Sequence, residues 1–192
     1  MQVPPNSRYL TNMSVVWAMD NGRFACFDQP TQTWRAERWN RGAFLDLLAT
    51  RRDLPGCVFV VAPDVFMNAQ ATTHEFWNWR AFIVGQGYPV AYALQDGVTP
   101  ALVPWGACDA LFIGGSNAVH FSETTRRIIR TAKRHGLWVH WGRGSTPTFI
   151  HYARAIGCDS CDSSAFARFT DDRLTPILPE LDITQHVLFD FN

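Results

Sequence analysis

The sequence lacks any long hydrophobic run. No stretch approaches the roughly 18 consecutive apolar residues of a membrane-spanning helix. It also lacks an apolar secretory segment, because its first residues, Met1-Gln2-Val3-Pro4-Pro5, are polar and rich in proline. The formal net charge is zero, which excludes a protein that coats nucleic acid through bulk positive charge. We therefore expect a cytoplasmic protein with no membrane partner.

Cysteine is scarce and odd in number, with five in the chain, which argues against a complete disulfide framework. Free thiols in a reducing compartment are the expectation. Cys158 and Cys161 form a single Cys-x-x-Cys pair, a spacing found in zinc half-sites and redox pairs. No second such pair exists, and strand alternation allows both to be buried thiols, so we expect no metal and no other cofactor.

The 192 residues are 47% hydrophobic, enough for one domain with a substantial core. Eight tryptophans and fourteen phenylalanines indicate a core packed with rings, some of which are candidates for stacking on bases. Apolar runs predict strands over 15–19, 57–62, 89–94, 110–113, 137–141 and 158–161. Periodicity predicts helices over 41–52, 72–85, 122–135 and 148–156, the second capped by Thr72 or Thr73. We expect an irregular arm over 1–13, a loop over 24–33, and a tail over 170–192 in which 183–191 is a last strand or extended chain.

Strands that alternate with helices of this length predict parallel βαβ units. Two architectures fit: a compact TIM-barrel-like (β/α) barrel, reduced or incomplete, and an open doubly wound sheet. A full barrel needs about 250 residues, with roughly 200 at the low end, so a barrel here would be pared down.

Polar or glycine residues follow most of the predicted strands. They are Asp20-Asn21-Gly22, Asp64, Gln95-Asp96-Gly97, Gly114-Gly115 and the run Gly157-Cys158-Asp159-Ser160-Cys161-Asp162. The carboxyl ends of parallel strands form the active-site rim of such folds. Taken singly, each motif is equally typical of a turn, a helix cap or an anion nest. Together they predict an enzyme site at this edge.

The order of these motifs resembles that of the tRNA-guanine transglycosylase superfamily. The family's Asp-Ser-Gly-Gly-Phe turn is similar to Asp20-Asn21-Gly22-Arg23-Phe24, and its base-binding Asp to Asp64. Its Val-Gln-Gly-Gly run is similar to Leu94-Gln95-Asp96-Gly97, and its later Gly-Gly to Gly114-Gly115. Its Met-Gly-Val-Gly-Thr-Pro run loosely resembles residues 141–147, and its Gly-x-Asp-x-Phe-Asp-Cys run resembles residues 157–163.

The resemblance covers about residues 14–165 and is greatest to the short, mostly viral branch related to deazaguanine DNA transglycosylases. The family's zinc cluster of three cysteines and a histidine has no counterpart, and its RNA-binding appendages are missing. The resemblance therefore implies that guanine-containing DNA and a free 7-deazaguanine base, such as preQ0, are the substrates. It also implies a host-cytoplasm location if the protein is viral, and allows a homodimer.

The family's roles carry over position by position. Asp162 is implied as the nucleophile at the sugar carbon and Asp20 as the general acid/base. Asp64 is implied to accept hydrogen bonds from a guanine-like base, with Asp159 as a nearby support. Gln95 and the Gly114 and Gly115 amides would read the base carbonyl. Phe24 or Trp141 would stack on the purine.

Other residues keep two interpretations. Arg143, in a glycine-flanked loop, is a phosphate candidate. The basic helix face from Arg126 to Arg134 is either a phosphate contact or a solvated surface. His140 is either a polar group of the rim or a packing residue. Two other functions also fit the same acids: a base hydrolase or exchanger acting on free nucleosides or nucleotides, and a non-catalytic subunit that binds a modified base.

Overall fold

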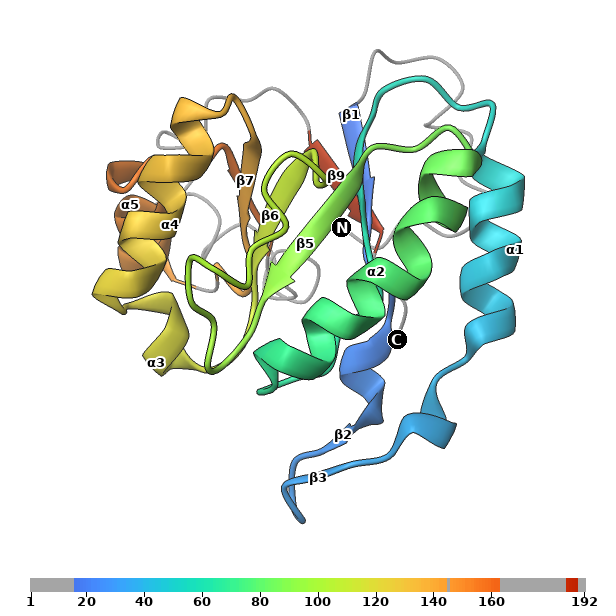
Figure 1. Ribbon diagram of the computed structural model, residues 1–192, viewed down its shortest axis with the longest axis horizontal. Coiled ribbons are helices and arrows are strands. Elements are labelled where there is room, and N and C mark those ends of the chain that lie inside the picture. The colour runs from blue at the N-terminus through green and yellow to red at the C-terminus, as the bar shows by residue number, and fades with distance from the viewer. Residues whose placement is uncertain (1–15, 145, 163–185, 190–192) are drawn as a thin grey trace.

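Seven strands form one parallel sheet in the computed structural model, which describes residues 16–144, 146–162 and 186–189 (Figure 1). The strands are β1 (Val16–Met19), β4 (Cys57–Val61), β5 (Val90–Leu94), β6 (Ala110–Ile113), β7 (Trp138–Trp141), β8 (Ser160–Cys161) and β9 (His186–Phe189). Their order is β8-β7-β6-β5-β4-β1-β9, and every neighbouring pair is parallel. The α/β class and the parallel sheet are thus confirmed.

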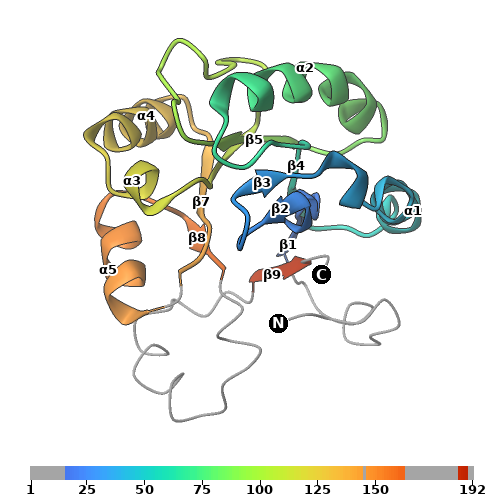
Figure 2. The ribbon, with the colours of Figure 1, turned by 90° about the horizontal axis from the view of Figure 1, so that it is seen from below.

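Each strand from β4 to β8 is added next to its predecessor, and β9 returns to the far edge beside β1. The sheet curves into a half-barrel, with the helices along its outer side (Figure 2). This arrangement is compatible with a reduced barrel and with an open sheet. The two interpretations of 183–191 are resolved in favour of a strand over His186–Phe189. The predicted arm over 1–13 and the tail residues 170–182 lie outside the described residues.

Five helices are described: α1 (Arg41–Arg51), α2 (Ala69–Gly85), α3 (Asn117–His120), α4 (Glu123–Arg134) and α5 (Pro147–Ala155). Side chains cap four of them, with Asn40, Asn68, Ser122 and Thr146 each accepting a backbone N–H of the first turn. The prediction that Thr72 or Thr73 caps the second helix is wrong. That helix begins earlier because Asn68 caps it, and the Thr72 hydroxyl instead bonds both N–H and C=O of Val65.

Residues 24–33, expected to be a loop, contain short elements. The 3₁₀ turn η2 (Arg23–Cys26) leads into a small antiparallel pair, β2 (Phe27–Asp28) and β3 (Thr33–Trp34), followed by the 3₁₀ turn η3 (Ala36–Arg38). Figure 1 shows this segment projecting beyond the carboxyl end of the sheet. No helix in the described part of the chain is long and apolar enough to cross a membrane.

The sheet has two different faces, since side chains alternate along each strand. The outward face carries large apolar residues such as Trp17, Tyr92 and Trp141, which pack under the helices. The inward face is built from smaller residues with a few rings between them: Ala18, Phe59, Val61, Ala91, Ala93 and Ala110, with Val58, Phe112 and Trp138 against them.

Candidate active-site rim

Polar residues from six strands meet along the carboxyl edge of the sheet. Two series of contacts link them. One runs from Asp20 and Asn21 after β1 through Asp64 to Gln95 after β5, and the other runs from Gly115 after β6 through Arg143 to Asp162 after β8. The prediction that separate motifs gather at one edge is thereby realised for these residues. We call this set the rim.

Asp64 is held by two side-chain amides. Asn21 Nδ2 donates to Oδ1 at 2.9 Å, and Gln95 Nε2 donates to Oδ2 at 2.5 Å. Burial raises the pKa of Asp64 above its usual range, although these hydrogen bonds and the nearby Arg23 guanidinium act in the opposite direction. Asp64 is therefore a carboxyl that is both fixed in place and easier to protonate than an exposed aspartate.

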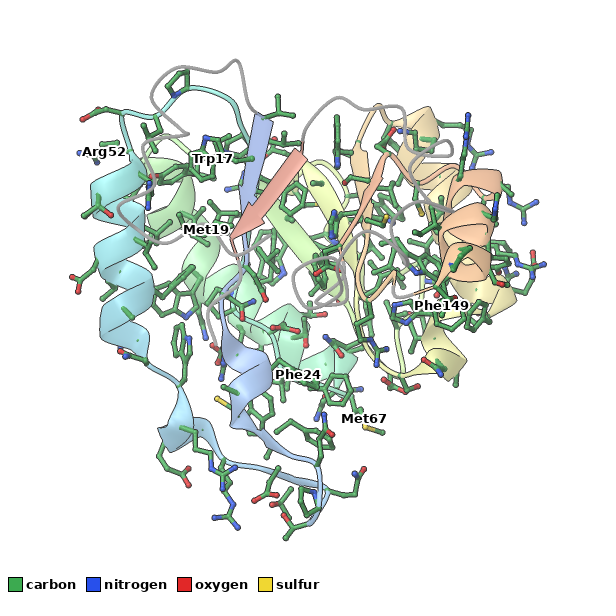
Figure 3. The ribbon with its side chains drawn as sticks, turned by 180° about the vertical axis from the view of Figure 1, so that it is seen from behind. Trp17, Met19, Phe24, Arg52, Met67 and Phe149 are labelled. Carbon is green, nitrogen blue, oxygen red and sulfur yellow. The ribbon has the colours of Figure 1, made fainter. Side chains whose placement is uncertain are left out.

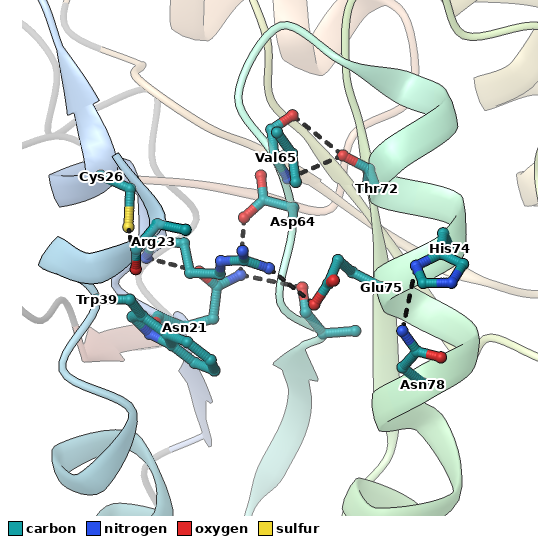
Figure 4. A network of polar contacts seen from close by, with 12 residues as sticks. Asn21, Arg23, Cys26, Trp39, Asp64, Val65, Thr72, His74, Glu75 and Asn78 are labelled. Carbon is teal, nitrogen blue, oxygen red and sulfur yellow. Dashed lines mark hydrogen bonds and ion pairs between the residues drawn. The ribbon is translucent and has the colours of Figure 1, made fainter. Parts of the chain in front are cut away.

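Asn21 is a member of the rim that the sequence pattern indicated only as part of a turn. Its side chain is buried, with 2% exposed. Nδ2 also donates to Ala62 O at 3.0 Å, and Oδ1 accepts the Arg23 N–H at 2.8 Å (Figure 4). Asp20 Oδ1 in turn accepts the Asn21 N–H at 2.7 Å. The Asp-Asn-Gly turn thus joins the ends of β1 and β4.

Arg23 stabilises the Asp-Asn-Gly turn. The guanidinium is buried, pairs with Glu75 at 2.9 Å, and lies over the rings of Trp34 and Trp39 at 5.3 and 5.1 Å. Trp39 Nε1 donates to Asn21 O at 2.8 Å. Cation–π contacts and a partly buried ion pair therefore fix the turn that carries Asp20 and Asn21.

The resemblance implied that Gln95 reads the carbonyl of a base. The structure instead directs its side chain into the protein. Only 2% of the residue is exposed, and its amide is engaged at both ends: Nε2 donates to Asp64 and Oε1 accepts Met67 N–H at 3.0 Å. A buried amide must satisfy both of its polar atoms, and these two partners do so. Gln95 therefore positions Asp64.

Gly114 and Gly115, the two glycines after β6, differ in the hydrogen bonding of their backbone N–H groups. The Gly114 N–H donates to Leu94 O at 3.1 Å, so the prediction that it reads a ligand is wrong. The Gly115 N–H makes no hydrogen bond within the described residues. Gly115 has φ 73°, and a Cβ there would lie 2.8 Å from Asp96 Oδ2. Asp96 accepts both N–H and hydroxyl of Ser116, which holds the Gly115 turn.

Arg143 lies at the rim, with its guanidinium directed into the protein. Its Nη2 donates to Gly115 O and lies 3.3 Å from His120 Nδ1. The backbone N–H of Arg143 donates to Asp162 Oδ1 at 2.6 Å. The guanidinium thus bridges the loops that follow β6 and β7, and because Arg143 is exposed, a phosphate contact stays a prediction.

Asp162 follows β8 and stands beside His140, whose Nε2 lies 3.7 Å from Oδ1. Burial acts to raise the pKa of Asp162, but the imidazole and the Arg143 N–H outweigh it and lower the pKa below its usual range. The side chain keeps 25% of its surface exposed. An ionised carboxylate with access to solvent is suited to act as a nucleophile.

Asp159 does not join Asp162, and this prediction is wrong. The Asp159 carboxylate pairs with Lys133 Nζ at 2.6 Å and accepts the Val139 N–H at 2.8 Å, at the amino end of β7. Because β7 and β8 run parallel, the three-residue spacing carries Asp162 to the opposite end. Asp159 instead fastens α4 to the sheet.

Of the two stacking candidates, only Phe24 lies at the surface. It is 42% exposed and meets Phe66 edge-on at 5.1 Å, and Phe27 packs on the same ring at 4.7 Å. Figure 3 shows Phe24 and Met67 at the carboxyl end of the sheet. Trp141 is fully buried under α5 beside His120 and Tyr152, so it cannot stack on a ligand.

The remaining candidates are Cys158, Cys161 and the basic face of α4, whose contact with phosphate stays a prediction. Burial raises the pKa of Cys158 to about 12 and that of Cys161 to about 11, so both are protonated thiols at neutral pH. No group of three or more metal-binding side chains exists among the described residues. On the basic face of α4, Arg126 and Arg130 pair with Glu123, and Lys133 pairs with Asp159.

Comparison with known proteins adds distant similarities only. No protein-family model and no curated protein matches the chain. Among solved structures, it is similar to a chain of the Amycolatopsis orientalis BexX/CysO complex, with 16% identity and a TM-score of 0.44 over 69% of this chain and 57% of that one. This chain thus spans little more than half of that one. A native KDPGal structure is similar at 17% identity with a TM-score of 0.35, covering 84% of each chain.

Proposed function

We propose that this protein is a base-exchange transglycosylase, built on a reduced (β/α) barrel, that replaces guanine in DNA with a 7-deazaguanine. The observation that carries the proposal is the pair of carboxylates on one rim. Asp162 is held in its ionised form by its neighbours, while Asp64 is buried with a raised pKa. Two carboxyl groups with opposite pKa shifts are typical of sites in which chemically equal acids have different tasks, here attack on the sugar by Asp162 and contact with the base by Asp64.

In this mechanism an Asp162 oxygen bonds to the sugar C1′ as the bond from C1′ to guanine breaks. The departing base takes a proton from Asp20, so guanine leaves as a neutral molecule. The incoming 7-deazaguanine then loses a proton to Asp20, its ring nitrogen bonds to C1′, and the Asp162–sugar ester breaks. The carboxylate is thereby regenerated, and no cofactor is needed.

Asp64 would contact the polar edge of the base, fixed for that purpose by Asn21 and Gln95. The Gly115 N–H is the remaining backbone donor for a base carbonyl, and Phe24 offers an exposed ring for stacking. A base inside duplex DNA would have to be flipped out, so single-stranded DNA should be the better substrate.

The test is exchange of labelled guanine into guanine-containing DNA, single-stranded and duplex, with free nucleosides in a parallel arm. Asp162→Asn should lower the exchange rate by on the order of 10³-fold or more, because the nucleophile is removed. Asp159→Asn is the matched control, since that carboxylate lies at the other end of the same strand. Exchange by Asp162→Asn at the wild-type rate would refute the assignment, and exchange only with nucleosides would redirect it to that smaller substrate.

A further inference from the structure

A chain of polar side chains leads to Asp162 along the inward face of the sheet. Trp138 Nε1 donates to Ser160 Oγ at 2.8 Å, and the same hydroxyl lies 2.8 Å from His140 Nδ1. On the other side of the ring, His140 Nε2 is buried and has no hydrogen bond within the described residues. Its nearest acidic atom is Asp162 Oδ1, at 3.7 Å.

The His140 ring has little freedom to turn away from this line. Phe112 stacks on it at 5.1 Å with the planes 19° apart, and Phe59 meets it edge-on at 5.6 Å. Only 3% of His140 is exposed. The orientation of the ring is therefore set by apolar packing, and Nε2 remains directed toward the rim.

The contacts of Ser160 allow an assignment of the His140 ring proton, which we infer to lie on Nε2. The indole N–H of Trp138 can only donate, so it occupies one acceptor position of the Ser160 hydroxyl. The Ser160 O–H is then free to donate to Nδ1 of His140. A neutral imidazole whose Nδ1 accepts must carry its hydrogen on Nε2, and this N–H faces the carboxylate.

We propose that His140 is the positioning residue of Asp162, with its Nε2–H, oriented by Ser160 and Trp138, directing and fixing the carboxylate at the rim. The imidazole does not touch the reacting atoms. Its consequence for catalysis rests on the proposed function, whereas its effect on the carboxylate does not. Two other basic side chains interact electrostatically with Asp162. They are Arg143, which also donates its backbone N–H, and His120, whose Nε2 lies 3.0 Å from Gly142 O.

The test is a carboxyl titration by ¹³C NMR of protein labelled at aspartate, with the Asp162 resonance assigned by its loss in Asp162→Asn. His140→Phe keeps a ring between Phe59 and Phe112 but removes the N–H. We expect the Asp162 midpoint to rise by about one pH unit in this variant. His140→Gln, which restores an amide N–H at a similar reach, should return the midpoint toward that of the wild type.

An unchanged midpoint in folded His140→Phe would overturn the proposal. If that variant does not fold, the wild-type protein decides the question through the ¹⁵N shifts of its histidines. A neutral His140 with its proton on Nε2 supports the assignment, and one with its proton on Nδ1 overturns it. Neither measurement requires a substrate.

Kinetics separate positioning from a purely structural role. In the exchange assay, His140→Phe should lower kcat about 10- to 100-fold with little change in KM for the base, because binding is assigned to other residues. The acid limb of the rate profile should move to higher pH, since Asp162 must be ionised to attack. An unchanged kcat and acid limb would contradict the catalytic consequence. Absence of exchange in the wild type would refute the proposed function and leave the titration result intact.

Discussion

Asp64 and Asp162 are chemically identical side chains whose surroundings differ. Asp64 receives two neutral amide donors and is penalised mainly by burial. Asp162 is also penalised by burial, but a histidine and a backbone N–H stabilise its charge. The sequence shows both as acids after strands, yet it does not reveal the direction in which either pKa moves. That direction depends on partners supplied by other strands.

The raised pKa of Asp64 predicts how the free energy of unfolding depends on pH. Between the unfolded-state pKa, about 4, and the higher folded-state value, the folded protein binds more protons. The free energy of unfolding of the wild type, relative to Asp64→Asn, should therefore fall as the pH rises through this window. The fall should be about 1.4 kcal/mol for each pH unit that separates the folded-state pKa from the unfolded-state pKa. Urea unfolding of both proteins from about pH 3.5 to about pH 8 spans the window and measures it.

Asp162→Asn serves as the control, because the free energy of unfolding of the wild type relative to this variant should change with pH in the opposite direction. The folded-state pKa of Asp162 is lowered, so its contribution to stability is fully present above about pH 4 and is lost as the pH falls through the folded value. A wild-type advantage over Asp64→Asn that is independent of pH would show that Asp64 has an ordinary pKa.

At the scale of elements, periodicity predicted the main strands and helices well. The strand expected over 57–62 is β4 (Cys57–Val61), and the helix expected over 122–135 is α4 (Glu123–Arg134). The four-residue α3 and the β2–β3 pair were missed because they are too short to show a period. The Gln95 and Asp159 roles were missed because their partners, Asp64 and Lys133, lie 31 and 26 residues away.

The turn after β6 provides a test of how tightly the rim is built. Gly115→Ala places a side chain at φ 73° and a Cβ 2.8 Å from Asp96 Oδ2. We expect a loss of about 2–4 kcal/mol, from backbone strain together with displacement of Asp96. The matched control is Gly106→Ala, where φ is 76° and nothing lies within 4 Å of the added Cβ.

The control should lose only the strain component, about 1–2 kcal/mol. Thermal or urea unfolding of the two variants gives the difference directly. Equal losses would mean that Asp96 moves aside freely, and the turn would then be less constrained than its contacts indicate.

At the scale of the whole molecule, the curvature of the sheet depends on small residues on its inward face. Ala91 and Ala93 lie there with at most 1% of their surface exposed, between the rings of neighbouring strands. Alternation alone predicted buried strands but not which face would curve inward. That choice follows from side-chain volume across several strands together.

Ala93→Leu should therefore destabilise the protein by about 1–3 kcal/mol, since three added carbons must fit into a close-packed face. Ala81→Leu makes the same change on the exposed side of α2 and should alter stability by no more than about 0.5 kcal/mol. Urea unfolding of the two variants compares them. If Ala93→Leu were as stable as the wild type, the inward face would contain enough unfilled volume for the larger side chain.

The parallel pairing of β9 with β1 joins segments from opposite ends of the printed sequence. During synthesis on the ribosome, β1 leaves the exit tunnel before β9, because most of the described chain lies between them. Until β9 follows, β1 presents open backbone donors and acceptors along one side, which neighbouring nascent chains can bind. Such distant pairing slows folding. The interval before β9 is made is therefore when the unpaired edge of β1 is most open to other chains.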